Sequence, residues 1–247
     1  MKWCALQSCF AVLPLAVLLL TGTAQARTVT DWNGFRAGFS AAVTFGDHPD
    51  THTGLPPGPA SNGNYTINHG TSGWQAGLTG GYFWQQGPLV EGLEGNVQFG
   101  NAGGTQTLTG VAHRDGSGAS PSNFLAIRER IDTTFDLRGT LGLAVTRHFL
   151  PYVTGGWFYE HGYFSGQFHD AVPTDFIVRD GAGRSGWTLG AGLACRFNEV
   201  WVLKAEYLYY DVGRHAVLSS TIGGLQSQFD FGGTGGVVRV ALTLRVP

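Results

Sequence analysis

Apolar and polar residues alternate along eight segments of this chain. In the first segment, one parity holds six apolar residues: Phe35, Ala37, Phe39, Ala41, Val43 and Phe45. The other parity holds small or polar residues, and a period of two is typical of a β-strand that separates two environments. The eight segments are 35–46, 72–85, 89–100, 131–146, 150–163, 185–197, 201–213 and 237–246. The pattern therefore predicts an all-β domain.

The connections between these segments alternate between short and long. Short links occur at 86–88, 147–148 and 198–200. Long links rich in Gly, Ser and Asn predict four loops, centred near 47–71, 101–130, 164–184 and 214–236. Short periplasmic turns, long outer loops and an even strand count are typical of outer-membrane barrels. The prediction is an eight-stranded antiparallel up-and-down transmembrane β-barrel. Its segments exceed the roughly 9–11 residues that a tilted strand needs to span a membrane, so some strand ends should project from the membrane as hairpins.

The placement of aromatic residues indicates which face of the barrel meets lipid. A soluble barrel has the same alternation with its apolar side inward. If the chain starts in the periplasm, the lower rim carries Phe35, Tyr82, Trp84, Phe197 and Trp201. The upper rim then carries Phe45, Trp74, Trp187, Tyr207 and Tyr209. Aromatic belts at two heights are typical of two membrane interfaces, which favours the transmembrane barrel.

The opposite parity lines the lumen and carries seven charged residues: Arg36, Glu94, Asp136, Arg138, Lys204, Glu206 and Arg239. The interior of an eight-stranded barrel is only wide enough for side chains, and opposite charges there can pair. We therefore predict a filled interior with a salt-bridge network. The alternative is a small diffusion channel past inward glycines such as Gly77, Gly81 and Gly190, which bulky residues would block. The strand count disfavours it, because open aqueous pores occur in barrels of about 16–18 strands.

The first 26 residues have the pattern of an export signal. Lys2 precedes an apolar stretch at 11–20, and Ala24-Gln25-Ala26 forms a small-x-small site, so cleavage is expected between Ala26 and Arg27. Residues 27–247 then form one barrel domain, exported by the general secretion route to a Gram-negative outer membrane. No later segment has 18 consecutive apolar residues, which excludes helical spans. The net charge of −2 gives no reason to expect nucleic acid as a partner.

Six short motifs occur in order along the predicted strands: DWNGF at 31–35, GLEGN at 92–96, LRGTLG at 137–142, PYVTGG at 151–156, GWTLGAG at 186–192 and KAEYLYYDVG at 204–213. Together they resemble the alphaproteobacterial outer-membrane immunogenic proteins, often labelled porin family proteins, of the opacity-antigen type of eight-stranded barrel. The resemblance covers essentially the whole of 27–247. It implies a surface-exposed protein with similar strands and variable loops, and it brings no catalytic residues and no cofactor.

We expect a role in outer-membrane integrity and surface contact, without catalysis. The expected partners are outer-membrane lipid and lipopolysaccharide, the barrel assembly machinery, and an extracellular partner contacted through the long loops. Members of the family usually end in an aromatic residue that helps the assembly machinery recognise them. This sequence departs from that pattern with Leu244-Arg245-Val246-Pro247.

Two groups of residues could carry chemistry. His48, His52 and His69, with Asp47 and Asp50, are potential metal ligands, but their Gly- and Pro-rich surroundings offer no rigid framework, so solvated histidines are expected. The residue types of a barrel hydrolase occur at Glu160, His161, Ser165 and Ser185. Neighbours on a regular strand point to opposite faces, so Glu160 and His161 should not share one site. No enzyme activity is predicted.

One segment near the upper rim allows two interpretations. Arg128-Glu129-Arg130 and five loop aromatics could contact a partner or lipopolysaccharide phosphates; the aromatics are Phe124, Phe164, Phe168, Phe229 and Phe231. The favoured alternative is that the upper strand ends extend past the membrane as hairpins and bury some of these rings.

Overall fold

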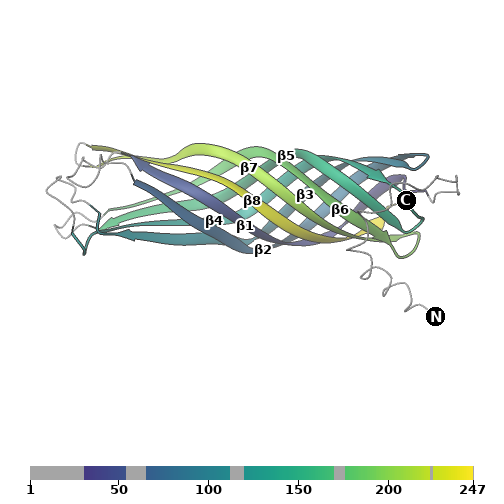
Figure 1. Cartoon of the computed structure of the whole chain (residues 1–247), viewed down its shortest axis with the longest axis horizontal. Coiled ribbons are helices and arrows are strands. Elements are labelled where there is room, and N and C mark those ends of the chain that lie inside the picture. The colour runs from purple at the N-terminus through teal and green to yellow at the C-terminus, as the bar shows by residue number, and fades with distance from the viewer. Residues whose placement is uncertain (1–30, 54–64, 112–119, 170–175, 223–224, 247) are drawn as a thin grey trace, which may run out of the picture.

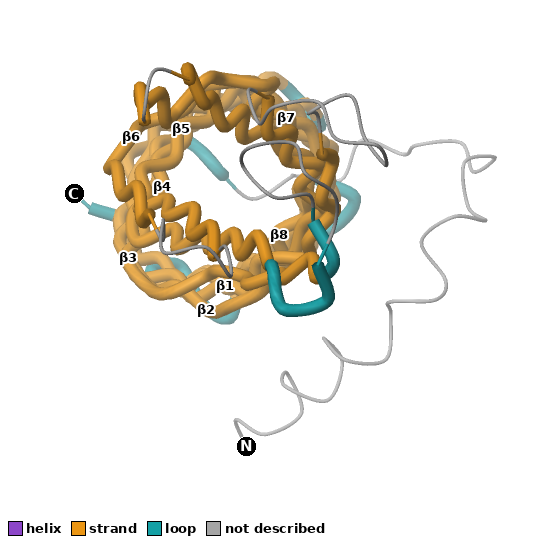
Figure 2. Tube along the Cα trace, turned by 90° about the vertical axis from the view of Figure 1, so that its left-hand side faces the viewer, coloured by secondary structure: helices purple, strands orange, loops and turns teal. Residues whose placement is uncertain are grey.

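Eight antiparallel strands close into a single barrel in the computed structural model (Figure 1). Each strand pairs with its neighbours in sequence, and β8 pairs with β1 to complete the ring (Figure 2). The strands are β1 (Gly34–Thr53), β2 (Tyr65–Gln86), β3 (Leu89–Thr109), β4 (Phe124–Leu143), β5 (Phe149–His169), β6 (Phe176–Arg196), β7 (Trp201–Ile222) and β8 (Leu225–Arg245). The structure describes residues 31–53, 65–111, 120–169, 176–222 and 225–246. The predicted cleavage site at Ala26 and Arg27 lies outside them.

The strands are longer than the alternation pattern predicts. Each has 20 to 22 residues, so parts of the four predicted loops are paired strand. For example, β3 and β4 stay paired up to Thr109 opposite Phe124, inside the predicted loop 101–130. At about 3.3 Å per residue and a typical tilt of about 40°, such strands rise roughly 50–55 Å, whereas the apolar band of an outer-membrane barrel is about 25 Å tall. About half of the barrel therefore projects beyond the membrane.

Side chains stabilise the short turns at one end of the barrel. Gly87, in the link between β2 and β3, has a φ of +61°, a conformation that favours glycine. The Thr146 hydroxyl accepts hydrogen bonds from the backbone N–H groups of His148 and Phe149 at 3.2 and 3.1 Å. Asn198 Oδ1 accepts from two N–H groups in the link between β6 and β7, at 2.9 and 2.8 Å. These local bonds satisfy the backbone where the ladder ends.

The outer wall is apolar and bears the expected aromatic residues. Phe39 is 72% exposed and Trp74 is 66% exposed, values that in a barrel of this type indicate contact with lipid. Nine of the ten predicted belt residues are exposed, all except Phe197. Belt rings also contact one another across strands, as Trp187 and Tyr209 do with centroids 5.5 Å apart. Among the described residues, no helix is long and apolar enough to cross a membrane.

Of the irregularities in the upper half of the barrel, two bear on the sites described below. A bulge at Asp132, between Ile131 and Thr133, shifts the register of β4 against β5 and reverses which parity of β4 points inward. Pairing of β6 with β7 runs only from Trp187 opposite Asp211 to Arg196 opposite Val202. In the described part of the chain, 176–186 of β6 pair only with β5. The ring is thus complete in the lower half and has a seam between β6 and β7 above it.

Candidate functional site

Six charged side chains meet in the lumen as a charge-balanced network. Three carboxylates face three cations: Glu94, Asp136 and Glu206 against Arg138, Lys204 and Arg239. All six residues are at most 7% exposed. They are six of the seven charged residues that the alternation pattern places in the lumen.

Arg138 on β4 is the centre of the network. Its Nε donates to Asp136 Oδ1 at 2.6 Å, and its Nη2 donates to Glu94 Oε1 at 3.0 Å. It also donates to both carboxylate oxygens of Glu206, from Nη2 at 2.9 Å and from Nη1 at 3.2 Å. Charge-assisted bonds of this kind are stronger than neutral ones, and the planar guanidinium fits several carboxylates at once.

Several of these contacts cross the lumen. Glu206 lies on β7, three strands away from Arg138 on β4 in the closed ring. Arg239 on β8 donates to Asp136 Oδ2 at 2.6 Å, and Lys204 on β7 pairs with Glu94 on β3. The network therefore joins the β3–β4 wall to the β7–β8 wall.

Two uncharged residues complete the hydrogen bonding. The Tyr152 hydroxyl donates to Glu206 Oε2 at 2.8 Å, and Asn96 Nδ2 donates to Asp136 Oδ1 at 2.9 Å. Buried carboxylates need such partners, because an unsatisfied buried acceptor is costly.

Further layers of side chains fill the lumen above the network. Gln75 Oε1 accepts from the hydroxyls of Thr44 and Thr134 at 3.3 and 3.2 Å. Phe158 and Tyr210 stack with ring centroids 4.7 Å apart and are 1% and 0% exposed. The stacked rings and the Gln75 layer therefore occupy the lumen above the network.

A second buried ion cluster lies in the projecting half. Arg184 on β6 pairs with Glu129 on β4 and Glu160 on β5, and His69 Nε2 lies 3.1 Å from Glu129 Oε2. All four residues are at most 3% exposed. His69 is therefore not a solvated loop histidine, as the sequence suggested, but a buried member of this cluster. The bulge at Asp132 explains why Glu129 points inward although Asp136 and Arg138 have the other parity.

The short-turn end of the lumen is filled by Trp32. The guanidinium of Arg196 lies 4.3 Å from the Trp32 ring centroid and that of Arg36 lies 5.6 Å away, as cation–π partners. Arg36 is buried, but it sits in this layer and not in the central network. The prediction for Arg36 is wrong in that respect, because its position near the start of β1 places it below the network.

Asp31 lies beside this layer, before β1. Its carboxylate accepts from Asn33 and lies 3.2 Å from Arg245 Nη2. Slight burial raises the pKa of Asp31, but the Asn33 hydrogen bonds and the charge of Arg245 together hold it below its ordinary value.

The inward glycines are sites of close strand approach. A Cβ at Gly77 would lie 1.9 Å from the Val97 backbone oxygen, and one at Gly190 would lie 2.1 Å from the Tyr207 backbone oxygen. Bulky residues there would displace backbone, so they cannot be used to block a channel without disturbing the fold.

The four residues considered for hydrolysis do not form one site. Glu160 points inward and pairs with Arg184, whereas His161 lies on the outer wall with Nδ1 3.1 Å from Asp132 Oδ1. Ser165 lies four residues beyond His161 on the same face of β5, and Ser185 lies on β6. Within the described residues, no group of three or more His, Cys, Asp or Glu side chains could hold a metal ion.

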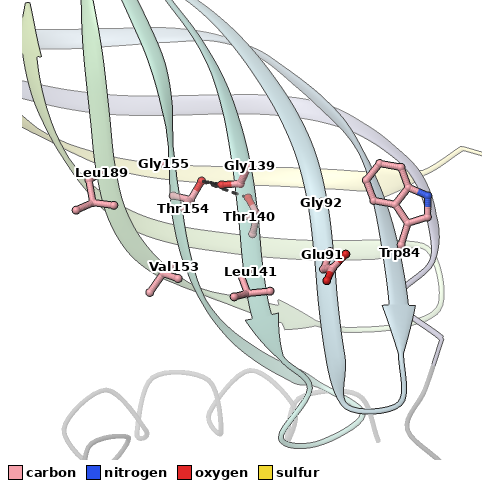
Figure 3. Close-up of a pocket in the computed structure, with 10 residues that line it drawn as sticks. All are labelled: Trp84, Glu91, Gly92, Gly139, Thr140, Leu141, Val153, Thr154, Gly155 and Leu189. Carbon is pink, nitrogen blue, oxygen red and sulfur yellow. Dashed lines mark hydrogen bonds between the residues drawn. The ribbon is translucent and has the colours of Figure 1, made fainter.

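A shallow groove runs along the lipid-facing wall (Figure 3). Trp84, Glu91, Leu141, Val153 and Leu189 line it, and the small residues Gly139 and Gly155 form part of its floor. Glu91 is the one titratable group among the residues that line it. The other polar side chains of the lining are Thr140 and Thr154, whose hydroxyls hydrogen-bond to each other at 3.2 Å, so Glu91 has no second titratable group beside it for acid–base chemistry.

Several site residues were missed from the sequence. Arg184 shares the parity of Thr188 on β6, but it falls in a stretch predicted as loop. Tyr152 has the inward parity of Thr154, and its neutral side chain gave no reason to assign it to an ion network. Extending the inward-facing alternation along the full length of β5 and β6 would have assigned both residues to the lumen.

The lumen network and the aromatic outer wall are features of an outer-membrane barrel, and comparison with protein families agrees. The family model for the outer membrane protein beta-barrel domain matches residues 14–237. The chain belongs to this family and is an integral protein of the Gram-negative outer membrane.

Two named proteins have sequences similar to this chain. The 31 kDa outer-membrane immunogenic protein of Brucella melitensis biotype 1 is 27% identical over 203 residues, which cover 81% of this chain and 79% of the relative. The protein of the same name from Brucella suis biovar 1 gives the same values.

Two solved structures match this chain at low similarity. The outer membrane protein OprG of Pseudomonas aeruginosa has a TM-score of 0.48 at 14% identity, covering 87% of this chain and 97% of that chain. The outer membrane protease OmpT of Escherichia coli has a TM-score of 0.47 at 9% identity, covering 90% and 100%. Both TM-scores lie below 0.5, so these similarities support no inference about activity.

Proposed function

We propose that this chain is a structural and surface-interacting protein of the outer membrane whose barrel neither conducts ions nor catalyses a reaction. The observation that carries the proposal is the balanced network around Arg138, which joins opposite walls of the lumen. Its three cations and three carboxylates saturate one another, so a permeating ion would have to break several charge-assisted bonds to pass.

The layers beyond the network support a closed lumen. Trp32 and its two arginines fill the short-turn end, and the stacked Phe158 and Tyr210 lie on the other side of the network. Eight strands enclose only enough space for side chains, whereas water-filled pores occur in much wider barrels.

The half that projects beyond the membrane is the part suited to surface contact. Strands of 20 to 22 residues raise the connecting loops well clear of the lipid headgroups. The Brucella relatives are named outer-membrane immunogenic proteins, which supports a surface-exposed role for this chain as well.

The absence of catalysis is part of the proposal. On the outer wall, the His161 ring pairs with Asp132. Among the described residues, no hydroxyl is hydrogen-bonded to this ring. A nucleophile and its base must be within about 2.6–3.2 Å of each other, and Ser165 is too far along β5 to meet this condition.

Single-channel conductance of the refolded protein in a planar bilayer tests the proposal. The heat-dependent gel shift should first establish that the barrel is folded. We expect no discrete steps from the wild type. The variant Glu94→Ala/Lys204→Ala removes one cation and one anion that contact each other, so the remaining lumen charges stay balanced while space opens. Small steps from this variant would identify the network as the main barrier, whereas silence would show that the Trp32 layer and the stacked rings close the lumen as well.

Glu199→Ala in the exposed link between β6 and β7 is the control and should stay silent. Reproducible steps from the folded wild type would refute the closed-lumen proposal and favour a diffusion channel.

A further inference from the structure

Three arginines gather on the outer wall of the projecting half. Arg128 and Arg130 lie on β4, and Arg179 lies on β6; all three are exposed. The strand β5 runs between them. Ser165 is the register partner of both Arg128 and Arg179, and Tyr163 is the partner of Arg130. The three arginines, Tyr163 and Ser165 line one pocket, which we call the arginine cluster.

The positive charge of the arginine cluster is not compensated by the described side chains around it. No ion pair joins any of the three arginines to a described carboxylate. Glu129 lies between Arg128 and Arg130 in sequence, but it points into the lumen and pairs with Arg184. Asp132, the next carboxylate along β4, pairs with His161. Three guanidinium groups are thus presented to the exterior with two hydroxyls beside them.

The height of the cluster places it just beyond the membrane interface. Trp157 of β5 lies at the height of the upper belt, because it is the register partner of the belt residue Trp187, and Tyr159 packs beside it with ring centroids 6.0 Å apart. Tyr163 and Ser165 follow Tyr159 on the same face of the strand. At about 3.3 Å per residue and a tilt of about 40°, they lie roughly 10–15 Å above that ring. The cluster faces sideways over the lipid surface, not upward into the medium.

We propose that the arginine cluster binds phosphate groups of lipopolysaccharide in the outer leaflet. A guanidinium presents a rigid fork of donors that matches phosphate oxygens, and several together favour a group of clustered phosphates. The hydroxyls of Tyr163 and Ser165 add donors of the kind that phosphate oxygens accept. This inference goes beyond the proposed function, because the cluster would bind the lipid whether or not the lumen conducts.

Binding of purified lipopolysaccharide to the folded, detergent-solubilised full-length protein tests the proposal. The variant Arg128→Gln/Arg130→Gln/Arg179→Gln removes the charge of the cluster, and Arg147→Gln in the exposed link between β4 and β5 is the matched control. The probes are phosphorylated lipopolysaccharide, the same lipid after phosphatase treatment, and inorganic phosphate alone. We expect the triple variant and the phosphatase treatment each to weaken binding by at least about tenfold, since each lost charge-assisted contact costs about a factor of ten. The control should bind like the wild type.

Unchanged affinity in the folded triple variant would overturn the proposal, as would equal binding of the dephosphorylated lipid. Binding of inorganic phosphate as tight as that of the lipid would reassign the cluster to free anions and overturn the lipid assignment. If the triple variant loses its heat-dependent gel shift, the single variants Arg128→Gln and Arg179→Gln replace it. Each should then weaken lipid binding by about tenfold, and an unchanged affinity in both would likewise overturn the proposal.

Discussion

Replacing Glu206 by alanine is expected to destabilise the folded barrel by about 3–5 kcal/mol, because one partner of a buried ion network is removed while the others remain. Glu206 accepts four hydrogen bonds, two from Arg138, one from Arg239 and one from the Tyr152 hydroxyl. Its loss leaves a net charge of +1 among buried groups and removes the acceptor of a buried hydroxyl. With an m value of about 2 kcal/mol/M in urea, the unfolding midpoint should fall by roughly 2 M.

Urea unfolding in lipid vesicles, followed by tryptophan fluorescence and by the heat-dependent gel shift, measures this change. Arg239→Ala alone should also destabilise the barrel, since Asp136 and Glu206 would lose a cation. The double variant Glu206→Ala/Arg239→Ala restores the charge balance, so its cost should be smaller than the sum of the two single costs by about 2 kcal/mol or more. Glu199→Ala, in an exposed link, should change stability by less than about 0.5 kcal/mol. Wild-type midpoints for both single variants, or strictly additive costs, would refute the interior network.

Three other predictions concern an inward glycine, the Asp31 carboxylate and the seam between β6 and β7. Gly77→Ala, whose Cβ would lie 1.9 Å from a backbone oxygen, should destabilise the barrel by about 1–3 kcal/mol. Gly139→Ala is the control and should fold normally, because the atom nearest to its Cβ would be 3.9 Å away. Equal urea midpoints for the two variants would contradict the close approach of β2 to β3. The lowered pKa of Asp31 implies a stability contribution that is present above the unfolded pKa of about 3.9 and is lost as the pH falls through the lower folded value. Carboxyl NMR should show this low midpoint, and Arg245→Gln should raise it; the same midpoint in the variant would exclude the contribution of Arg245. In hydrogen exchange, amides of 178–186 on the side of β6 that faces β7 should exchange much faster than those of 187–196, and uniform protection along β6 would argue against the seam.

The upper strand ends show why the alternation pattern predicts shorter strands than the structure has. Within the membrane, one face of a strand meets lipid and the other meets the lumen, so the alternation is strong. Above the membrane the outer face meets water and becomes polar, as Arg128 and Arg130 illustrate on β4. Leu125 and Ile127 still point inward there and are fully buried. The favoured interpretation of the upper aromatics is confirmed for Phe164 and Phe168, which are 1% and 0% exposed inside the projecting hairpin.

The sequence by pattern alone predicts the number and direction of the strands, the lipid-facing wall and the six charged residues of the central lumen network. These follow from a period of two and from the height of aromatic rings, both of which are local properties. The alternation pattern could not show which lumen charges pair with each other, since Arg138 and Glu206 are 68 residues apart and meet only when the ring closes.

Only the tertiary structure decided which charges pair, where Arg36 lies and which parity of β4 points inward above Asp132. Those outcomes depend on the stagger between strands and on a bulge, which shift a side chain to another height or another face without changing the alternation around it. The arginine cluster has the same origin. Arg128 and Arg179 are far apart in sequence, and the register of β4, β5 and β6 brings them to the two sides of Ser165.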